Sequence, residues 1–381
     1  MASSANQMAW LAFAPVTTGA AAHFRVSTST IGLLSEIFPL LYVLLAMPAG
    51  RAVDRSLRKW LGTGAVLSAI GTVLRLAGTT RSGFAWVLAG QVVVAAAQPL
   101  LLNSVTALAR RYLAPADRPV GIAICSAGTF LGFVLAFITG ATIGARVNDL
   151  LLLGAAYAAA GGAALVVALV RTPCPFGGER SSSLAGLAEL RQLWADPVMR
   201  ALVYFVFVGF GVFVSLTTWA QPLLQPAGVS TSTADTLLTA MVIAGVASSA
   251  VLPPVIARRG LQLPSLVAGG VATIVGCGLL AAAPGVVGGA VGLCLVGLFL
   301  LPGLPVMLEV AERRSGDGAA AAAGLIWLAG QGGGIVVAVA CGALEGTPWL
   351  AFSLLAIVVV SAVPAASHLR GRLSSQALGT A

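Results

Sequence analysis

Twelve apolar runs, each long enough to cross a bilayer, are the feature that most limits the folds open to this chain of 381 residues. A helix needs roughly 20 residues to cross a hydrocarbon core about 30 Å thick. Backbone N–H and C=O groups find no water there, so a continuous apolar run crosses as a helix. The runs are 4–24, 30–50, 60–78, 84–107, 120–140, 150–170, 198–221, 234–257, 263–283, 287–310, 318–342 and 348–367.

A polar segment divides these runs into two sets of six. Residues 171–197 contain prolines, adjacent glycines, serines and several charges. We therefore expect an N-terminal six-helix bundle over 1–170, a cytoplasmic linker over 171–197, a C-terminal bundle over 198–367 and a cytoplasmic tail over 368–381. The predicted fold class is an all-α polytopic membrane protein with 12 transmembrane helices in two pseudo-symmetric six-helix bundles.

Composition excludes a soluble domain and argues against an enzyme. Only 9% of the residues are charged, against roughly 25% in soluble domains. The basic residues form short clusters between apolar runs and no patch with interleaved aromatics, so we expect the lipid bilayer as a partner and no nucleic acid. The five cysteines have no metal-ligand spacing, and no catalytic or phosphate-loop signature occurs. We expect no enzymatic activity, no cofactor and no bound metal.

The basic residues also predict the orientation. If residues 51–59 face the cytoplasm, 17 of the 21 Lys and Arg residues lie on the cytoplasmic side and three lie outside. The positive-inside rule then places both termini in the cytoplasm, and we expect a bacterial-type inner membrane. The first run begins almost at Met1 without a basic flank. Either the true start lies upstream, or the first helix lacks its cytoplasmic half.

One charged stretch between the second and third runs carries a motif. Residues 50–59 read Gly-Arg-Ala-Val-Asp-Arg-Ser-Leu-Arg-Lys. Gly50 permits close helix approach, and Asp54 is placed to cap the next helix or to face a helix dipole. Arg55 and Arg58 are placed for lipid phosphates or for carboxylates of a partner helix. A basic loop that only fixes topology is the alternative for the arginines.

This stretch resembles the G-x-L-A-D-R-x-G-R-K loop motif of the major facilitator superfamily, with alanine in place of the leucine and leucine in place of the second glycine. Within that superfamily, the chain is similar to the FLVCR-type (feline leukaemia virus subgroup C receptor-related) transporters, which include choline and ethanolamine carriers. The matching stretches are Asn6-Gln7-Met8-Ala9-Trp10, Phe13-Ala14-Pro15, Leu34-Ser35, Pro48, Gly90-Gln91, Ala97-Gln98, Pro305, Glu309, Gly324-Leu325 and Gly330-Gln331.

The FLVCR-type resemblance implies a substrate site. Members of the family hold the ammonium of choline between aromatic faces, helped by glutamines. Carried over, the aromatic is Trp10 and the amides come from Gln98, Gln331 and Gln91, with Asn6 in the same stretch as Trp10. In the alternative, Trp10 packs against a neighbouring helix and the glutamines bond across helices.

The chain departs from the family at the second aromatic of this cage. The position that aligns with it is Val214, and this half-open cage weakens the case for choline itself.

Charges inside the runs are costly and mark functional positions. Glu36 and Arg75 lie at similar depths from the outer side of their runs. Two interpretations stay open: a structural Glu36–Arg75 ion pair, or Glu36 as a proton-coupling or outer-gate carboxylate. Glu309 lies at the cytoplasmic end of the tenth run beside Arg313 and Arg314, where we expect an inner gate network.

The tenth run also holds two prolines. Pro302 and Pro305 remove two backbone donors and predict a broken helix. In a carrier, such a break is tolerated where the backbone lines a cavity.

The sequence therefore predicts a secondary active or facilitative carrier of a small organic solute, working by alternating access. The solute we favour is an organic cation such as choline or ethanolamine, with protons or ions as coupling species and a monomeric state. One alternative is a proton-coupled exporter of drugs or metabolites. The other is a receptor or sensor that transports nothing.

Overall fold

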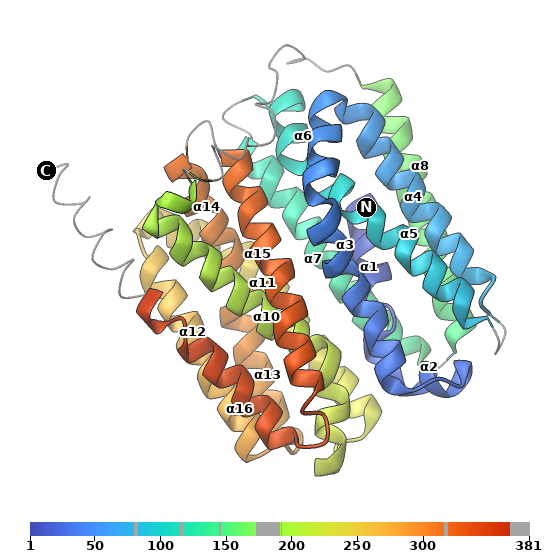
Figure 1. Ribbon diagram of the computed structural model, residues 1–381, viewed down its shortest axis with the longest axis vertical. Helices are drawn as coiled ribbons and strands as arrows, with labels where there is room; N and C mark the ends of the chain where they lie inside the picture. Colours follow the sequence, from blue (N-terminus) through green and yellow to red (C-terminus); the bar gives the residue numbers. More distant parts are fainter. Residues whose placement is uncertain are drawn as a thin grey trace, which may run out of the picture. The chain divides into compact units, whose positions relative to one another are not determined.

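The computed structural model describes residues 1–79, 83–114, 118–144, 146–172, 191, 193–315 and 319–365. Within these ranges the chain is helical and contains no strand. It divides into two compact units, Met1–Leu184 (unit 1) and Ala185–Ala381 (unit 2), which are described separately (Figure 1). This confirms the predicted all-α fold class.

In the described part of the chain, nine helices are long and apolar enough to cross a membrane. Unit 1 contains α1 Ala2–Leu11, η1 Ala14–Val16, α2 Thr17–Phe24, α3 Thr28–Arg55, α4 Leu57–Leu76, α5 Phe84–Leu102, α6 Ser104–Tyr112, α7 Arg118–Ile143 and α8 Val147–Arg171. Unit 2 contains α10 Pro197–Leu224, η2 Gln225–Ala227, α11 Thr231–Arg259, α12 Gln262–Ala282, α13 Val286–Leu300, α14 Gly303–Ser315, α15 Ala319–Gly342 and α16 Pro348–Val360.

The same helix pairings occur in both units. In unit 1 the most extensive contacts join α1 to α7, α3 to α5, α4 to α5 and α4 to α8. In unit 2 they join α10 to α15, α11 to α13, α12 to α13 and α12 to α16. Each partner in the second set is the counterpart of one in the first, so the two units are repeats of one packing scheme, as expected for a major facilitator fold.

Glycines set the closest of these approaches at matching positions. An added Cβ at Gly71 in α4 would lie 2.7 Å from the carbonyl oxygen of Gly90 in α5. In unit 2, an added Cβ at Gly276 in α12 would lie 2.6 Å from the carbonyl oxygen of Gly292 in α13. Small residues let helix backbones meet at this distance. The two units therefore share a close backbone contact at equivalent helix pairs.

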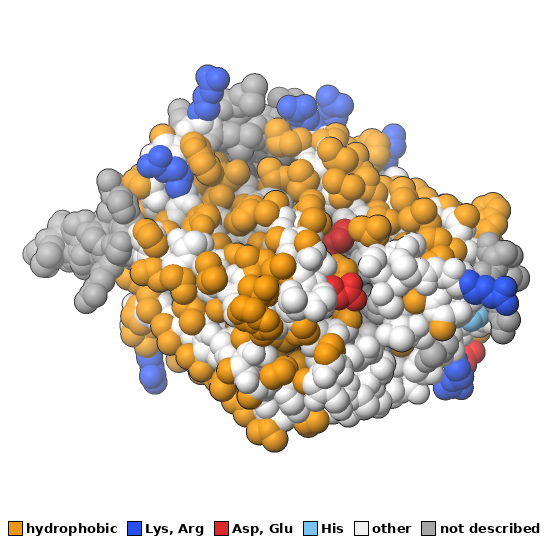
Figure 2. Space-filling model, turned by 60° about the horizontal axis from the view of Figure 1, so that its bottom comes forward, with side chains coloured by type: hydrophobic (Ala, Val, Ile, Leu, Met, Phe, Trp, Pro, Cys, Tyr) orange, Lys and Arg blue, Asp and Glu red, His pale blue; other side chains and the backbone are white. Residues whose placement is uncertain are grey.

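The exposed side chains are those that lipid accommodates. Leu44, Val170, Val287 and Ile357 have exposed fractions above 60%. Figure 2 shows that hydrophobic side chains predominate on the face drawn. Exposed apolar surface of this extent is unfavourable in water and favourable against hydrocarbon.

Within the described residues, the first, fourth and tenth predicted runs are each divided into shorter helical segments. The break in the tenth run is confirmed, because α13 ends at Leu300 and α14 begins at Gly303. The fourth run is divided at Asn103, where the amide donates to the carbonyl of Ala46 at 3.0 Å and accepts from the Tyr42 hydroxyl at 2.8 Å. The break in the first run was not predicted and is described below.

The charged motif is more helical than its interpretation as a loop implied. The α3 helix continues to Arg55 and α4 begins at Leu57, so only Ser56 separates them. A helix can extend through charged residues at the membrane boundary because water and lipid headgroups solvate their side chains.

Candidate functional site

The first transmembrane segment of unit 1 is broken near its middle. The α1 helix ends at Leu11, and Pro15 lies in the 3₁₀ turn that follows. Pro15 has no N–H, so it withdraws the helical donor of the Leu11 carbonyl. The last carbonyls of α1 lack intrahelical donors, and other groups must satisfy them at this depth.

Arg75 of α4 supplies one of these donors. Its guanidinium donates to the carbonyl of Ala9 at 3.2 Å and lies over the Phe13 ring, 5.0 Å from the centroid. The side chain is buried, and no ion pair joins it to Glu36 within the described residues. Of the two interpretations left open for Glu36, the ion pair with Arg75 is therefore not formed. Equal depth along two helices does not make their side chains point toward each other.

Leu280 is the unit 2 counterpart of Arg75, which indicates that packing between these two helices does not by itself require a charged side chain. Next to Gly90, the nearest side chain across the helix pair is Arg75. Next to Gly292, the corresponding neighbour is Leu280. Because leucine satisfies the same packing in the repeat, the guanidinium serves the broken α1 helix and its Phe13 ring.

Gln91 of α5 reaches the same break from the other side. Its amide nitrogen donates to the carbonyl of Leu34 at 3.1 Å and approaches the carbonyl of Trp10 at 3.5 Å. Its Oε1 atom is buried without a hydrogen-bond partner. Gln91 therefore joins α1, α3 and α5 and retains one free acceptor.

Trp10 is buried inside unit 1, with an exposed fraction of 2%. Its indole N–H donates to the carbonyl of Ser35 at 2.7 Å. Its ring stacks on Phe38, with centroids 5.5 Å apart and planes 5° apart, and meets Phe133 at 75°. One face of the indole is therefore occupied by a neighbouring ring.

A chain of amides joins Gln98 to α1. Gln98 donates to Gln7 at 3.4 Å, and Gln7 donates to Asn6 at 3.4 Å. Asn6 donates to the Ser68 hydroxyl at 3.0 Å and to the Val94 carbonyl at 2.9 Å. The chain ends on backbone and hydroxyl acceptors, while Oε1 of Gln98 is buried without a partner.

Glu36 of α3 has an unsatisfied side chain. Both carboxylate oxygens are buried, and neither has a hydrogen-bond partner. The residue lies three and four positions from Leu33 and Leu40, which are exposed and share its face of α3. Asn6 and Gln98 thus share one chain of amides, Trp10 and Gln91 contact each other and α3, and Glu36 has no hydrogen bond to either group.

In unit 2, the carried-over amide is Gln331 of α15. It is fully buried, and neither of its amide atoms has a partner. Val214 is buried, and an added Cβ at Gly334 would lie 3.3 Å from its Cγ2. Gln331 belongs to a different unit from Trp10 and Gln98, so the convergence of these three side chains stays a prediction.

The motif residues of unit 1 contact the ends of neighbouring helices. The Arg58 guanidinium donates to the Tyr112 hydroxyl at 3.1 Å and to the carbonyl of Thr172. Gly50 is buried and Arg55 is exposed. The side chain of Asp54 lies outside the described residues, so its predicted role stays a prediction. Arg58 therefore ties the start of α4 to the ends of α6 and α8.

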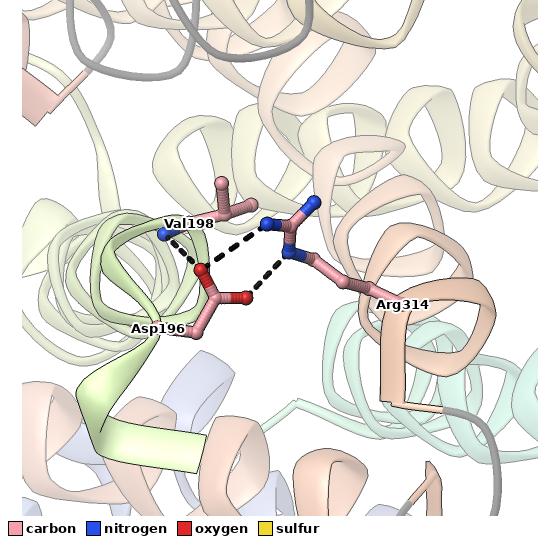
Figure 3. Close-up of polar contacts among 3 residues, drawn as sticks. All are labelled: Asp196, Val198 and Arg314. Atoms are coloured by element: carbon pink, nitrogen blue, oxygen red, sulfur yellow. Dashed lines mark hydrogen bonds and ion pairs between the residues drawn. The ribbon is translucent and has the colours of Figure 1, made fainter. Parts of the chain in front are cut away.

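Arg314 in unit 2 pairs with a residue that the sequence interpretation missed. Its guanidinium contacts both carboxylate oxygens of Asp196, whose Oδ1 also accepts from the N–H of Val198 at 3.0 Å (Figure 3). Asp196 is the N-cap of α10, and Asp followed by Pro197 is a recognisable helix-start signal. Arg314 thus pairs with an acid from the segment before α10, and the expected inner gate network around Glu309 stays a prediction.

The sequence pattern of the Major Facilitator Superfamily matches residues 1–339 of the chain. The chain belongs to the Major Facilitator Superfamily. This membership agrees with the repeated packing of the two units and makes the chain a multi-pass membrane protein of a small-solute transporter family.

Two of the curated relatives are members of a solute carrier family. The chain is 29% identical to Solute carrier family 49 member A3 of Danio rerio over 344 residues, which are 86% of this chain and 73% of the relative. It is 25% identical to the Xenopus tropicalis protein of that name over 248 residues, 60% of this chain and 51% of the relative.

Solved structures share the major facilitator fold at low identity. The human organic anion transporter MFSD10 has a TM-score of 0.74 and 15% identity, covering 96% of this chain and 97% of the other. The E. coli fucose:proton symporter FucP has a TM-score of 0.69 and 16% identity, also covering 96% and 97%. Because their named substrates differ in charge and chemistry, this likeness shows the fold alone.

Proposed function

We propose that this major facilitator protein is an FLVCR-type secondary or facilitative carrier of a small organic cation. The similarity to Solute carrier family 49 member A3 and the matching stretches in the first, second, fourth, tenth and eleventh predicted runs support this assignment. The remaining parts of the proposal are alternating access, no enzymatic activity, a monomeric state, a bacterial-type inner membrane and cytoplasmic termini.

The observation that carries the proposal is the unpaired carboxylate of Glu36. Both of its oxygens are buried without a partner, and no Lys, Arg or His forms an ion pair with it among the described residues. An isolated carboxylate at membrane depth is costly unless a proton or a cation compensates it. A transported ammonium group would supply that compensation.

The buried acceptors favour an ammonium with N–H groups over a quaternary one. Oε1 atoms of Gln91 and Gln98 are buried without donors, as are both oxygens of Glu36. A primary ammonium offers three N–H donors, whereas the ammonium of choline offers none. One face of Trp10 is occupied by Phe38, and the position that aligns with the second aromatic of the family's cage is Val214. Both features weaken the case for choline, whose ammonium is held by aromatic faces. We therefore favour ethanolamine-like solutes.

Uptake into proteoliposomes tests the proposal. Purified protein should accumulate or equilibrate labelled ethanolamine, and unlabelled primary amines of similar size should compete better than choline. Glu36→Gln keeps the side chain's shape and removes its charge, so uptake should fall at least about tenfold, the equivalent of 1.4 kcal/mol of binding. Asp149→Asn is the matched control, because Asp149 is exposed and pairs with Arg146. Full uptake by Glu36→Gln would reject Glu36 as the cation's partner.

A proton-coupled exporter is the second candidate, and the same carboxylate favours it. In that case Glu36 carries a proton in one direction, and flux should follow an imposed pH gradient across the vesicle membrane. An ethanolamine flux that ignores the gradient supports the facilitative carrier. The absence of flux for every solute tested would favour a receptor or sensor.

A further inference from the structure

Two buried side-chain oxygens near the end of α10 in unit 2 lack donors, and one of their residues contacts a buried carboxylate at the start of α11. We propose that Asp235, Gln221 and Thr218 form a binding site for a small monovalent metal cation, with Na⁺ as the ion of choice. This site lies outside the residues assigned to the organic solute and goes beyond the proposed function. We call these three residues the α10–α11 cation site.

Asp235 supplies the negative charge of the site. It is the fifth residue of α11, and its exposed fraction is 6%. Its carboxylate accepts one hydrogen bond, from the amide nitrogen of Gln221 at 3.2 Å. No ion pair to Lys, Arg or His involves Asp235 in the described part of the chain. A single neutral donor leaves the charge of a buried carboxylate largely uncompensated.

Gln221 and Thr218 supply further oxygens without donors. Because the Gln221 nitrogen points to Asp235, its Oε1 atom stays free, and that atom is buried without a partner. Thr218 Oγ1 is buried without a partner as well. The two residues are three positions apart on α10 and therefore share a helix face. Gln221 and Thr218 are buried, with exposed fractions of 1% and 4%, so bulk water does not reach these atoms.

The backbone of α10 adds a carbonyl to the same turn. Pro222 lies four residues after Thr218 and has no N–H, so the Thr218 carbonyl lacks its helical donor. The last turn of a helix also carries the negative end of its dipole, which favours a cation. Carboxylate, amide, hydroxyl and backbone oxygens around one helix end are the ligands that Na⁺ takes at broken or terminal helices in transporters.

The composition of the site selects the charge and hardness of the ion. Oxygen ligands without sulfur or imidazole favour hard cations. One carboxylate balances one positive charge, and no group of three His, Cys, Asp or Glu residues suited to a metal occurs within the described residues. Divalent ions gather several carboxylates or waters, so the site suits a monovalent ion.

The test is the thermal stability of the purified chain without any organic solute. Melting is followed in NaCl, LiCl, KCl and N-methylglucamine chloride at constant ionic strength. A ligand that binds only the folded protein raises Tm in a saturable way. We expect such a rise with NaCl and none with N-methylglucamine chloride. Equal melting temperatures in all four salts would overturn the proposal.

Variants assign the effect to the site. Asp235→Asn should abolish the NaCl-dependent rise, and Thr218→Val should shift its midpoint to higher NaCl concentration by several fold. Asp149→Asn should respond like the parent, because Asp149 is exposed in unit 1 and pairs with Arg146. A retained NaCl response in Asp235→Asn would overturn the proposal. If Asp235→Asn does not fold, an unchanged NaCl midpoint in Thr218→Val would overturn it. Because no solute is present, a negative result leaves the proposed transport function untouched.

Discussion

The indole N–H of Trp10 donates a 2.7 Å hydrogen bond to the carbonyl of Ser35, a carbonyl that has lost its helical donor because Pro39 stands four residues further on. Arg75 donates to the carbonyl of Ala9 and Gln91 approaches that of Trp10, and both carbonyls belong to the last turn of α1 before the 3₁₀ turn that contains Pro15. Side chains expected to recognise a solute therefore also satisfy the backbone of broken or proline-containing helices. In a membrane this role is essential, because water is absent there.

The Trp10–Ser35 bond predicts a specific pattern of stabilities. Trp10→Phe keeps an aromatic ring for Phe38 but leaves the Ser35 carbonyl without a donor, which should cost about 1–3 kcal/mol. Pro39→Ala restores an N–H at the position that normally bonds that carbonyl. The penalty of Trp10→Phe should thus be smaller in the Pro39→Ala background, as measured by a double-mutant cycle of melting temperatures. An unchanged penalty would show that the lost ring area, and not the hydrogen bond, decides the stability.

Glu36 and Arg75 should act independently. The guanidinium of Arg75 bonds to Ala9 and lies over Phe13, and the oxygens of Glu36 have no partner. Glu36→Gln should therefore mainly change transport, and Arg75→Gln should mainly lower stability. The loss of unfolding free energy in the double variant should equal the sum of the two single losses within about 0.5 kcal/mol. A double variant that is clearly milder than this sum would mean that the two charges interact.

The fold could be predicted from sequence because apolar length determines which segments cross a bilayer. The two six-helix units and the break at Pro302 followed from length, polarity and proline chemistry alone. Of the two interpretations of Glu36, the ion pair with Arg75 is not formed, for a physical reason. Position along a helix gives depth in the membrane, whereas contact also requires that two side chains face each other around their axes.

The satisfaction of freed carbonyls could be anticipated only in part. Pro15 and Pro39 identify Leu11 and Ser35 as residues whose carbonyls lose their helical donors, but the other unpaired carbonyls of the last turn of α1 follow from where that helix ends. The identity of the replacement donors depends on tertiary packing, and no sequence spacing links Arg75 to Ala9 or Trp10 to Ser35. Asp196 is different, since Asp before Pro197 at the start of an apolar run is a readable N-cap signal that the interpretation overlooked.

The glycine contacts predict a matched pair of substitutions in α12. Gly276→Ala would place a Cβ 2.6 Å from the carbonyl oxygen of Gly292, so α12 and α13 must separate and the melting temperature should fall. Gly278→Ala on the same helix meets nothing within 4 Å and should be neutral or stabilising by up to about 1 kcal/mol, because alanine is the better helix former. Equal effects of both substitutions would mean that helix propensity dominates over backbone approach.

The distribution of basic residues predicts the topology. Seventeen of the 21 Lys and Arg residues lie on the side assigned to the cytoplasm. At residue 185, a fused reporter that works only in the cytoplasm should be active, and one that works only in the periplasm should be inactive. Fusions within 25–29 should give the reverse. A periplasmic signal at residue 185 would invert the assignment of every loop.

Asp196 should contribute to stability twice, as the N-cap of α10 and as the partner of Arg314. Asp196→Asn keeps an oxygen for the N–H of Val198 and loses only the charge, whereas Asp196→Ala loses both. We expect Asp196→Ala to destabilise by about 1–2 kcal/mol and Asp196→Asn by less, since asparagine is an equally good cap and a partly exposed ion pair contributes little. The difference between the parent and Asp196→Asn should shrink at high salt, which screens the pair and not the cap. Melting temperatures of the two variants at low and high salt measure this, and equal losses for Asn and Ala would show that the ion pair outweighs the cap.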